Sequence, residues 1–206
     1  MKELVVFGAG GHGKVIADTA YCMGWSSILF YDDVYPSIKR IGEWDIIGTY
    51  SDLLKNSSNI NIVIGLGNNL IRVQKAQELS NLGFNFCSII HPKATISRSA
   101  QIANGTVIFA GAVINSDVTI DKHCIINTNS TVEHDCYLQT GVHISPGANL
   151  GGNVKVGQLS WIGIGSSIKH GVNIGINVTV GAGAAVIKDL PDNCTAVGIP
   201  ATILKE

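Results

Sequence analysis

The sequence predicts a small Rossmann-like α/β domain over residues 1–92, followed by a parallel β-helix over residues 93–206 that ends in a short tail. Two patterns predict this division. Before residue 92, apolar runs that suit buried strands alternate with helix-like runs and glycine-rich turns, as is typical of α/β proteins. From residue 96 to residue 186, every sixth residue is Ile, Leu or Val. A period of six fits neither a helix nor an isolated strand, and it indicates the hexapeptide repeats of a parallel β-helix.

The elements of the first domain follow from apolar spacing and from the glycines that end each run. Strands are expected at residues 4–7, 28–31, 60–64 and 86–90, with a further strand around residues 45–47. Helices are expected at residues 15–23, at residues 51–55 with Ser51 as N-cap, and at residues 70–79.

Each hexapeptide of the repeat is expected to form one short strand and one turn. The Ile, Leu and Val side chains point into the coil, and smaller side chains four residues later fill its corners. Cys124 and Cys136 fall on such inward corners, where cysteine acts as a small hydrophobic residue. Near the end of the chain, Pro191 and Pro200 bracket a tail that is expected to be irregular.

Composition excludes several classes of partner. Charged residues make up 14% of the chain, against about 25% in an average soluble domain, so part of the surface is expected to be covered by other subunits. The net charge is -1 with no basic run, so no nucleic acid is expected. No apolar run reaches the roughly 18 residues that span a membrane. The five cysteines lack CxxC spacing and the N-terminus lacks a signal pattern, which favours a reduced, cytoplasmic protein.

A glycine loop follows the first expected strand. Gly8-x-Gly10-x-x-Gly13 opens a helix and precedes Asp32 by about 19 residues, which is the spacing of a dinucleotide fingerprint. Backbone N–H groups at such a helix start suit a phosphate, although a tight turn that binds nothing is an alternative. Roughly 90 residues are too few for the usual two-halved dinucleotide fold, so a nucleotide attached to something other than nicotinamide is favoured over NAD.

One histidine stands out against the repeat. His134 occupies a turn position between Glu133 and Asp135, and a neighbouring carboxylate can hold one imidazole tautomer and raise its basicity, as a general base requires. The sequence does not distinguish which acid does so. His123 and His170 are assigned to solvated turns.

A metal site is the alternative for these histidines. The γ-class carbonic anhydrases carry zinc on this kind of coil, and the 36-residue separation of His134 and His170 matches two of their ligands. The third place falls on Gly175, so the ligand set is incomplete and no metal is expected.

Taken in order, these motifs resemble one family along the whole chain. The glycine loop, Asp32-Asp33, Leu66-Gly67-Asn68-Asn69, His91-Pro92 and Val132-Glu133-His134-Asp135 look like the NeuD/PglD-like bacterial sugar acetyltransferases. That family combines a short nucleotide-binding domain with a left-handed β-helix. It includes N-acetyltransferases of nucleotide-linked 4-amino-sugars and sialic acid O-acetyltransferases.

The resemblance implies roles for individual residues. His134 would be the catalytic base and Asp135 its acidic partner, at a position where N-acetylating members carry Glu. The family also implies a homotrimer in which acetyl-CoA lies between neighbouring coils. Acetyl-CoA contacts are implied at His143, Gly152, Ile164 and Ala182, and nucleotide-sugar contacts at Gly10, Gly11, His12, Asp32, Asp33 and Gly67.

The expected reaction is acetyl transfer from acetyl-CoA to the C4 amine of a UDP- or dTDP-linked 4-amino-4,6-dideoxyhexose in bacterial surface-glycan biosynthesis. The amine would attack the thioester directly, without an acyl-enzyme, and a backbone N–H such as that of Gly152 would stabilise the oxyanion. O-acetylation of sialic acid or another sugar is one alternative. A non-catalytic scaffold that binds nucleotide-sugars is another.

Overall fold

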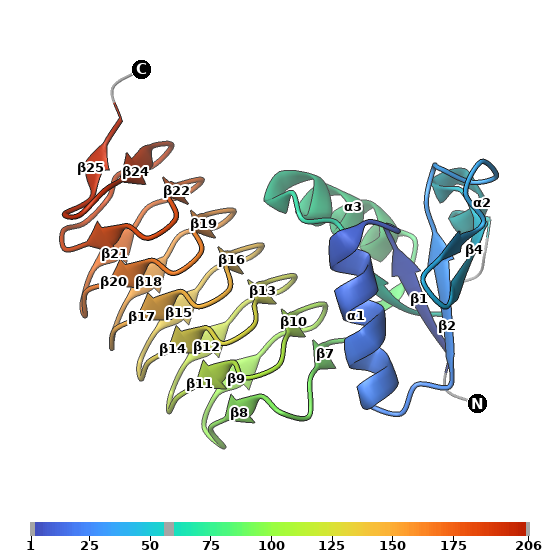
Figure 1. Cartoon of the computed structure of the whole chain (residues 1–206), viewed down its shortest axis with the longest axis horizontal. Coiled ribbons are helices and arrows are strands. Elements are labelled where there is room, and N and C mark those ends of the chain that lie inside the picture. The colour runs from blue at the N-terminus through green and yellow to red at the C-terminus, as the bar shows by residue number, and fades with distance from the viewer. Residues whose placement is uncertain (1–2, 56–59, 205–206) are drawn as a thin grey trace. The chain divides into compact units, whose positions relative to one another are not determined.

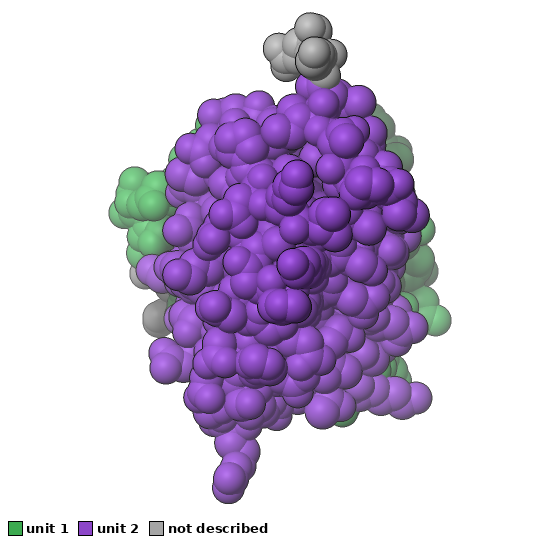
Figure 2. All heavy atoms as spheres, turned by 90° about the vertical axis from the view of Figure 1, so that its left-hand side faces the viewer, with its two compact units in different colours: residues 1–92 green, residues 93–206 purple. Residues whose placement is uncertain are grey.

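The structure is a computed structural model that describes residues 3–55 and 60–204. The chain forms two compact units, residues 1–92 and residues 93–206, which are coloured separately in Figure 2. Each unit has its own core, and each is described by itself below.

The first unit is built on a mainly parallel sheet, with strand order β3-β4-β2-β1-β5-β6 (Figure 1). The central strand β1 pairs in parallel with β2 and β5, and only β3 runs antiparallel to its neighbour. This arrangement confirms the Rossmann-like prediction. The strands are β1 (Glu3–Phe7), β2 (Ser27–Tyr31), β3 (Arg40–Ile41), β4 (Trp44–Gly48), β5 (Asn61–Ile64) and β6 (Asn85–Phe86).

Three helices accompany the sheet, namely α1 (Gly11–Cys22), α2 (Tyr50–Leu53) and α3 (Asn69–Asn81). Helix α1 begins four residues before the expected start, because the amide of Lys14 already donates to the carbonyl of Gly10. Helix α2 begins after Thr49 and not after Ser51. Thr49 and Asp52 form a reciprocal capping box, which satisfies more backbone N–H groups than Ser51 could.

Two further details of this unit differ from the prediction. The hairpin strand β3 was not expected. The single strand predicted at residues 86–90 is two strands, β6 and β7 (Ile89–Ile90), because β6 pairs with β5 whereas β7 belongs to a different sheet. The apolar strand positions were nevertheless predicted correctly, and all four residues from Leu4 to Phe7 are buried.

The second unit is a left-handed β-helix whose rungs are visible in Figure 1. Strands pair in parallel with strands 18 residues away, as Val113 does with Thr131, so three hexapeptides complete one coil. One sheet contains β10, β13, β16, β19, β22 and β24, the second β8, β11, β14, β17, β20 and β23, and the third β9, β12, β15, β18 and β21. The predicted repeat and its inward apolar residues are thereby confirmed.

The strands of the coil are two residues long, except for the three residues of β24. Their bounds are β8 (Thr95–Ile96), β9 (Gln101–Ile102), β10 (Val107–Ile108), β11 (Val113–Ile114), β12 (Thr119–Ile120), β13 (Ile125–Ile126), β14 (Thr131–Val132), β15 (Tyr137–Leu138), β16 (His143–Ile144), β17 (Asn149–Leu150), β18 (Lys155–Val156), β19 (Trp161–Ile162), β20 (Ser167–Ile168), β21 (Asn173–Ile174), β22 (Thr179–Val180), β23 (Ala185–Val186), β24 (Thr195–Val197) and β25 (Thr202–Ile203).

A left-handed backbone conformation recurs at every sixth residue from 105 to 183. These positions are Gly, or a non-glycine residue with φ between 53° and 63°. Asn, Asp and Gly tolerate this conformation best, and they occupy most of the series. Each such residue ends a turn of the coil, and Asp135 is one of them, with φ of 61°.

The tail is more regular than predicted. Strand β24 continues the first sheet by pairing with β22, and β25 pairs antiparallel with β24. The inward position of β24 is taken by Ala196, which is fully buried and extends the apolar stack.

Candidate active site

The predicted general base lies in a turn of the coil. His134 follows β14 in the turn of residues 133–135, and 60% of its side chain is exposed. Its Nδ1 lies 2.7 Å from Oδ2 of Asp135, whereas Glu133 accepts a hydrogen bond from Nδ2 of Asn115 at 2.8 Å. The two flanking acids therefore have different partners, and Asp135 is the one that bonds the imidazole.

The bond to Asp135 prepares the opposite ring nitrogen for base chemistry. An Nδ1–H that donates to the carboxylate leaves Nε2 as the basic nitrogen of His134. The same bond raises the pKa of His134. Within residues 3–55 and 60–204, Nε2 has no hydrogen-bond partner, so it can receive a proton from a ligand.

A glycine one coil later makes room for this histidine. A Cβ atom at Gly152 would lie 2.5 Å from both Cε1 and Nε2 of His134, which is too close for any side chain. The imidazole therefore rests directly against the backbone of Gly152. The N–H of Gly152 makes no hydrogen bond in the described part of the chain, and it lies beside the ring as an available donor.

The nearest cysteine does not provide a nucleophile. Cys136 is buried, as predicted from the repeat, and its Sγ lies 3.2 Å from the carbonyl oxygen of Gly151. Burial raises the pKa of its thiol to about 11. The reactive thiolate is therefore scarce near neutral pH.

His143 belongs to a second group of polar and aromatic residues. It lies on β16, is largely buried, and stacks on Trp161 with ring centroids 4.8 Å apart. Its Nε2 lies 3.2 Å from Nδ2 of Asn127, and the indole of Trp161 donates to Oγ of Ser145 at 2.7 Å. Trp161 and Ser145 were not predicted. Trp161 follows His143 by 18 residues, so the repeat itself placed it beside the histidine.

Ile164 and Ala182 occupy equivalent turn positions on another corner of the coil. They lie in successive turns, and the amide of Gly183 donates to the carbonyl of Ile164 at 2.8 Å. The N–H groups of Ile164 and Ala182 make no hydrogen bonds among the described residues, like that of Gly152. Gly152, Ile164 and Ala182 thus share a register position, but one chain places them on two corners, one after the second sheet and one after the first. The fourth residue predicted to contact acetyl-CoA, His143, lies on strand β16 and not in a turn.

The glycine loop of the first unit contains two kinds of glycine. A Cβ at Gly13 would collide with the carbonyl oxygen of Gly8, so the tight contact between loop and helix requires glycine there. By contrast, a Cβ at Gly10 or Gly11 would meet nothing within 4 Å, and the same holds for Gly67 in the loop between β5 and α3; none of these three has a left-handed backbone. The fold does not require these three predicted substrate-binding glycines.

The two predicted aspartates hold loops in place. Asp32 accepts hydrogen bonds from the amide of Ala9 at 2.6 Å and from the amide of Val34 at 3.0 Å. Asp33 accepts one from the amide of Tyr50 at 2.8 Å. Asp32 therefore fixes the glycine loop, whereas exposed Asp33 retains a carboxylate oxygen that can face a ligand.

His12 and Tyr50 lie in the same unit, and each has a shifted pKa. Burial, followed by the positive charge of Arg72, lowers the pKa of His12 to about 4, so this imidazole is neutral near pH 7. Tyr50 donates to Glu78 at 2.7 Å, and Lys75 lies 4.1 Å from the centre of its ring. Burial raises the pKa of Tyr50 far above its ordinary value. The sequence indicated His12 but not the contacts of Tyr50, because Tyr50 lies on α2 and both Lys75 and Glu78 lie on α3.

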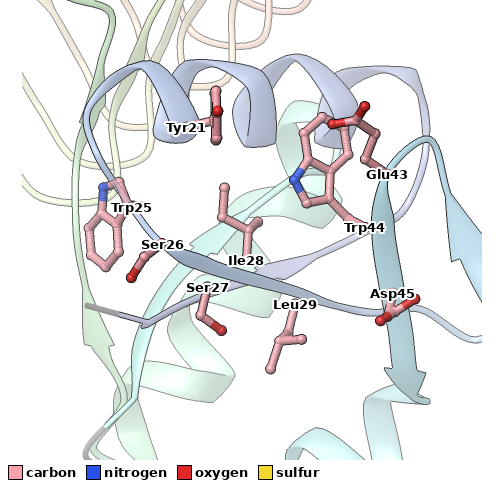
Figure 3. Close-up of a pocket in the computed structure, with 9 residues that line it drawn as sticks. All are labelled: Tyr21, Trp25, Ser26, Ser27, Ile28, Leu29, Glu43, Trp44 and Asp45. Atoms are coloured by element: carbon pink, nitrogen blue, oxygen red, sulfur yellow. The ribbon is translucent and has the colours of Figure 1, made fainter. Parts of the chain in front are cut away.

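A hollow of about 330 Å³ opens elsewhere in the first unit (Figure 3). It lies between the end of α1 and the amino ends of β2 and β4, with Tyr21 and Trp44 among its walls. Ligands of open α/β sheets bind beyond the carboxyl ends of the strands. None of the predicted site residues lines this hollow, and we do not assign the substrate to it.

Two remaining histidines and the metal alternative can be placed. His170 is exposed, as predicted, but His123 is 8% exposed and its ring lies against Gly105, so the prediction of a solvated turn was wrong there. Turn position does not determine what covers a residue.

Among the described residues, no three His, Cys, Asp or Glu side chains gather as metal ligands would. No described helix combines the length and apolarity of a membrane span.

Comparison with known proteins identifies the family. Residues 3–79 match the model of the PglD N-terminal domain. The acetyltransferase domain of PglB from Neisseria gonorrhoeae FA1090 superposes with a TM-score of 0.94 at 42% identity, covering 99% of this chain and 100% of that one. The chain belongs to the NeuD/PglD-like family of sugar acetyltransferases. Its relatives include UDP-N-acetylbacillosamine N-acetyltransferase of Bacillus subtilis and GDP-perosamine N-acetyltransferase of Escherichia coli O157:H7.

Related proteins carry the ligands expected of such a family. The PglB domain has also been solved with acetyl coenzyme A, with a TM-score of 0.95, 41% identity and coverage of 98% and 99% of the two chains. PerB from Caulobacter crescentus, solved with CoA and GDP-perosamine, has a TM-score of 0.92 and 32% identity, with coverage of 98% and 97%. UDP-N-acetylbacillosamine N-acetyltransferase of Bacillus subtilis is 39% identical, but the match spans only 53% of this chain and 52% of that enzyme.

Proposed function

We propose that this protein transfers an acetyl group from acetyl-CoA to the C4 amine of a nucleotide-linked 4-amino-4,6-dideoxyhexose in bacterial surface-glycan biosynthesis. The observation that carries the proposal is the His134 imidazole, bonded to Asp135 at 2.7 Å and seated against Gly152 with Nε2 open. A base oriented in this way is what direct attack by an amine on a thioester requires. All five cysteines are free, which fits a reducing compartment such as the cytoplasm.

The reaction follows from this geometry. The sugar amine attacks the thioester carbonyl of acetyl-CoA while Nε2 of His134 takes the proton that the nitrogen loses. The carbonyl oxygen becomes an oxyanion, for which the Gly152 N–H is a preorganised donor. Collapse of the tetrahedral intermediate breaks the carbon–sulfur bond, and the sulfur takes the proton held on Nε2 of His134, so that CoA leaves as the thiol and the base is regenerated. The products are the N-acetylated nucleotide-sugar and CoA, and no group becomes attached to the protein.

The donor and acceptor are assigned to different parts of the chain. We assign the nucleotide-sugar to the first unit, because Gly10, Gly11 and Gly67 leave open space that the fold does not use. We assign acetyl-CoA to the coil, through His143, Gly152, Ile164 and Ala182. Because one chain holds Gly152 on one corner of the coil and Ile164 and Ala182 on another, we propose that the active site forms between neighbouring coils of a homotrimer.

The candidate nucleotides are more numerous than the two, UDP and dTDP, that the sequence suggested. The relatives named above act on or bind a UDP-linked and a GDP-linked sugar, so GDP joins UDP and dTDP as a candidate. The residues of the first unit that we assign to the nucleotide-sugar do not favour one base over another.

A mass-spectrometric transfer assay tests the proposal. Purified protein and acetyl-CoA are incubated with UDP-, dTDP- and GDP-linked 4-amino-4,6-dideoxyhexoses, with the matching 4-hydroxy sugars as controls, and with free and CMP-linked sialic acid. We expect the mass of one acetyl group to be added to an amino-sugar nucleotide and to none of the hydroxy controls. Acetylation of sialic acid alone would replace the proposal with O-acetyl transfer. Binding of a nucleotide-sugar without any transfer would favour a scaffold.

A further inference from the structure

The largest fully buried side chain of the described residues is a cation in the unit that we assign to the nucleotide. Arg72 lies in the first turns of α3 and is 2% exposed. Its Nη1 donates to the carbonyl oxygens of Leu66 and Gly67, both at 3.1 Å, and its Nη2 donates to Oδ1 of Asn69 at 2.8 Å. Arginine is rarely buried without a specific reason, so these contacts with the β5–α3 loop need an explanation.

The contacts of Arg72 set the direction of two backbone N–H groups. In a trans peptide the C=O and the following N–H point in opposite directions. Because the carbonyls of Leu66 and Gly67 both face the buried guanidinium, the N–H groups of Gly67 and Asn68 both face away from it. Neither N–H has a hydrogen-bond partner within the described chain, and the space at Gly67 is open. Arg72 thus presents two adjacent donors on the outer side of the loop.

These donors lie at the same edge of the sheet as the glycine loop. Strands β1 and β5 are neighbours, and the amide of Gly65 donates to the carbonyl of Phe7 at 2.7 Å, where both strands end. Helix α1 begins there at Gly11, and its N-cap residue Gly10 supplies no side-chain cap, whereas Asn68 caps α3 through the amide of Ile71. Burial, followed by the positive charge of Arg72, lowers the pKa of His12 in the first turn of α1.

We propose that Arg72 is a positioning residue for the phosphate groups of the nucleotide. It holds the Gly67 and Asn68 N–H groups toward a phosphate oxygen, and its buried charge strengthens their attraction for that oxygen without touching the ligand. The planar guanidinium binds the two carbonyls through Nη1 and the side-chain oxygen of Asn69 through Nη2, an arrangement that lysine cannot reproduce. This inference rests on the proposed nucleotide-sugar substrate and adds which chemical part of it this loop selects.

Calorimetry on full-length variants tests the proposal. Wild type is first titrated with UDP, dTDP and GDP, and the nucleotide that binds is then compared with its own nucleoside. Arg72→Gln should weaken binding of the nucleoside diphosphate by about 10- to 100-fold, as loss of charge-assisted hydrogen bonds does, while binding of the nucleoside changes less than about threefold. Arg72→Lys keeps the charge and should fall between. Lys55→Gln, which removes a positive charge paired with Asp52 on the surface, should match wild type.

Outcomes of this test separate the inference from the proposed function. If wild type binds no nucleoside diphosphate, the proposed function fails and the inference with it. If wild type binds one but Arg72→Gln binds it equally well, or loses nucleoside and diphosphate to the same degree, only the role of Arg72 is overturned.

A measurement on wild type covers the case in which the Arg72 variants do not fold. The backbone amide signals of Gly67 and Asn68 are followed by NMR during titration with the same two ligands. Both signals should shift with the nucleoside diphosphate and stay in place with the nucleoside. Equal responses to the two ligands, or no response to the diphosphate, would overturn the assignment of these donors to phosphate.

Discussion

The turn that carries His134 and the glycine loop of the first unit both depend on glycine, but for opposite reasons. At Gly152 the imidazole of His134 occupies the space that a side chain would take. At Gly10, Gly11 and Gly67 nothing in the described chain fills the space. One region therefore uses glycine to fix a reactive group, and the other uses it to leave room. We infer that the region around His134 and Gly152 determines kcat, whereas the open glycines of the first unit determine the affinity for the nucleotide-sugar.

Removing the imidazole tests this difference with the largest expected effect. His134→Ala should lower kcat by about 10²- to 10⁴-fold, the usual contribution of a general base, with little change in the affinity for CoA. The measurement is steady-state kinetics together with CoA binding by calorimetry. His170→Ala is the matched control, because His170 is exposed and occupies the same register two coils later. Most of the wild-type turnover remaining in His134→Ala would refute the role of the base.

Filling the space at Gly152 should have the next largest effect. Gly152→Ala displaces the His134 ring, and a displacement of about 1 Å in a reacting group costs about 10²-fold in kcat. The double variant separates this cause from others. In a His134→Ala background, Gly152→Ala should cost nothing further, because no ring remains to be displaced. An equal loss in both backgrounds would mean that Gly152 acts through its own amide.

Changing the acid beside the base should have a smaller, pH-dependent effect. The bond to Asp135 raises the pKa of His134, and a general base works in its neutral form, so activity should rise with pH through this raised pKa. In Asp135→Asn the rise should move to lower pH, and the plateau should fall by about tenfold because the base itself remains. Asn tolerates the left-handed backbone at this position.

The control for this change is Asp117→Asn, at the same register one coil earlier, where φ is 59°. Its pH profile of kcat/KM should superpose on that of wild type. An unchanged profile for Asp135→Asn would show that another group sets the basicity of His134.

The two kinds of glycine in the first unit can be compared within one helical turn. Gly11→Ala adds a methyl group in open space and should raise KM for the nucleotide-sugar by about tenfold while leaving the fold intact. Gly13→Ala collides with the carbonyl of Gly8 and should destabilise the protein by about 1–3 kcal/mol, as overpacking does. Thermal unfolding and KM are measured for both. Loss of stability in Gly11→Ala would show that this glycine serves the fold.

Most of the fold could be predicted because its rules repeat along the chain. The six-residue period predicts which residues point inward, and the recurring Gly, Asn and Asp indicate the left-handed turns. The pairing of His134 with Asp135 was predictable as one of two choices, since both acids adjoin the histidine. The structure decides between them because Glu133 is engaged by Asn115, a residue one coil away.

What could not be predicted depends on contacts that the period does not encode. His123 occupies a turn, and only the packing around it makes it buried. Arg72 has the spacing of a helix surface residue, yet it turns back toward loop carbonyls five and six residues earlier. The sequence shows that an arginine is present at residue 72, but it does not show which carbonyl groups the guanidinium binds. The start of α2 was misplaced for a similar reason, because Ser51 and Thr49 are both acceptable caps.

The 18-residue offset between paired strands restricts how the length of this chain can change. Adding or removing 18 residues would lengthen or shorten the coil by one rung and return every later residue to its own edge. Adding or removing six residues would instead shift every later hexapeptide by one sheet of the three-sided coil. Each turn beyond the change would then lie above a different corner. Between His134 and Gly152 even a whole extra rung would separate the histidine from its glycine. Length variation compatible with activity is therefore confined to the two ends of the coil and to outward excursions of single turns.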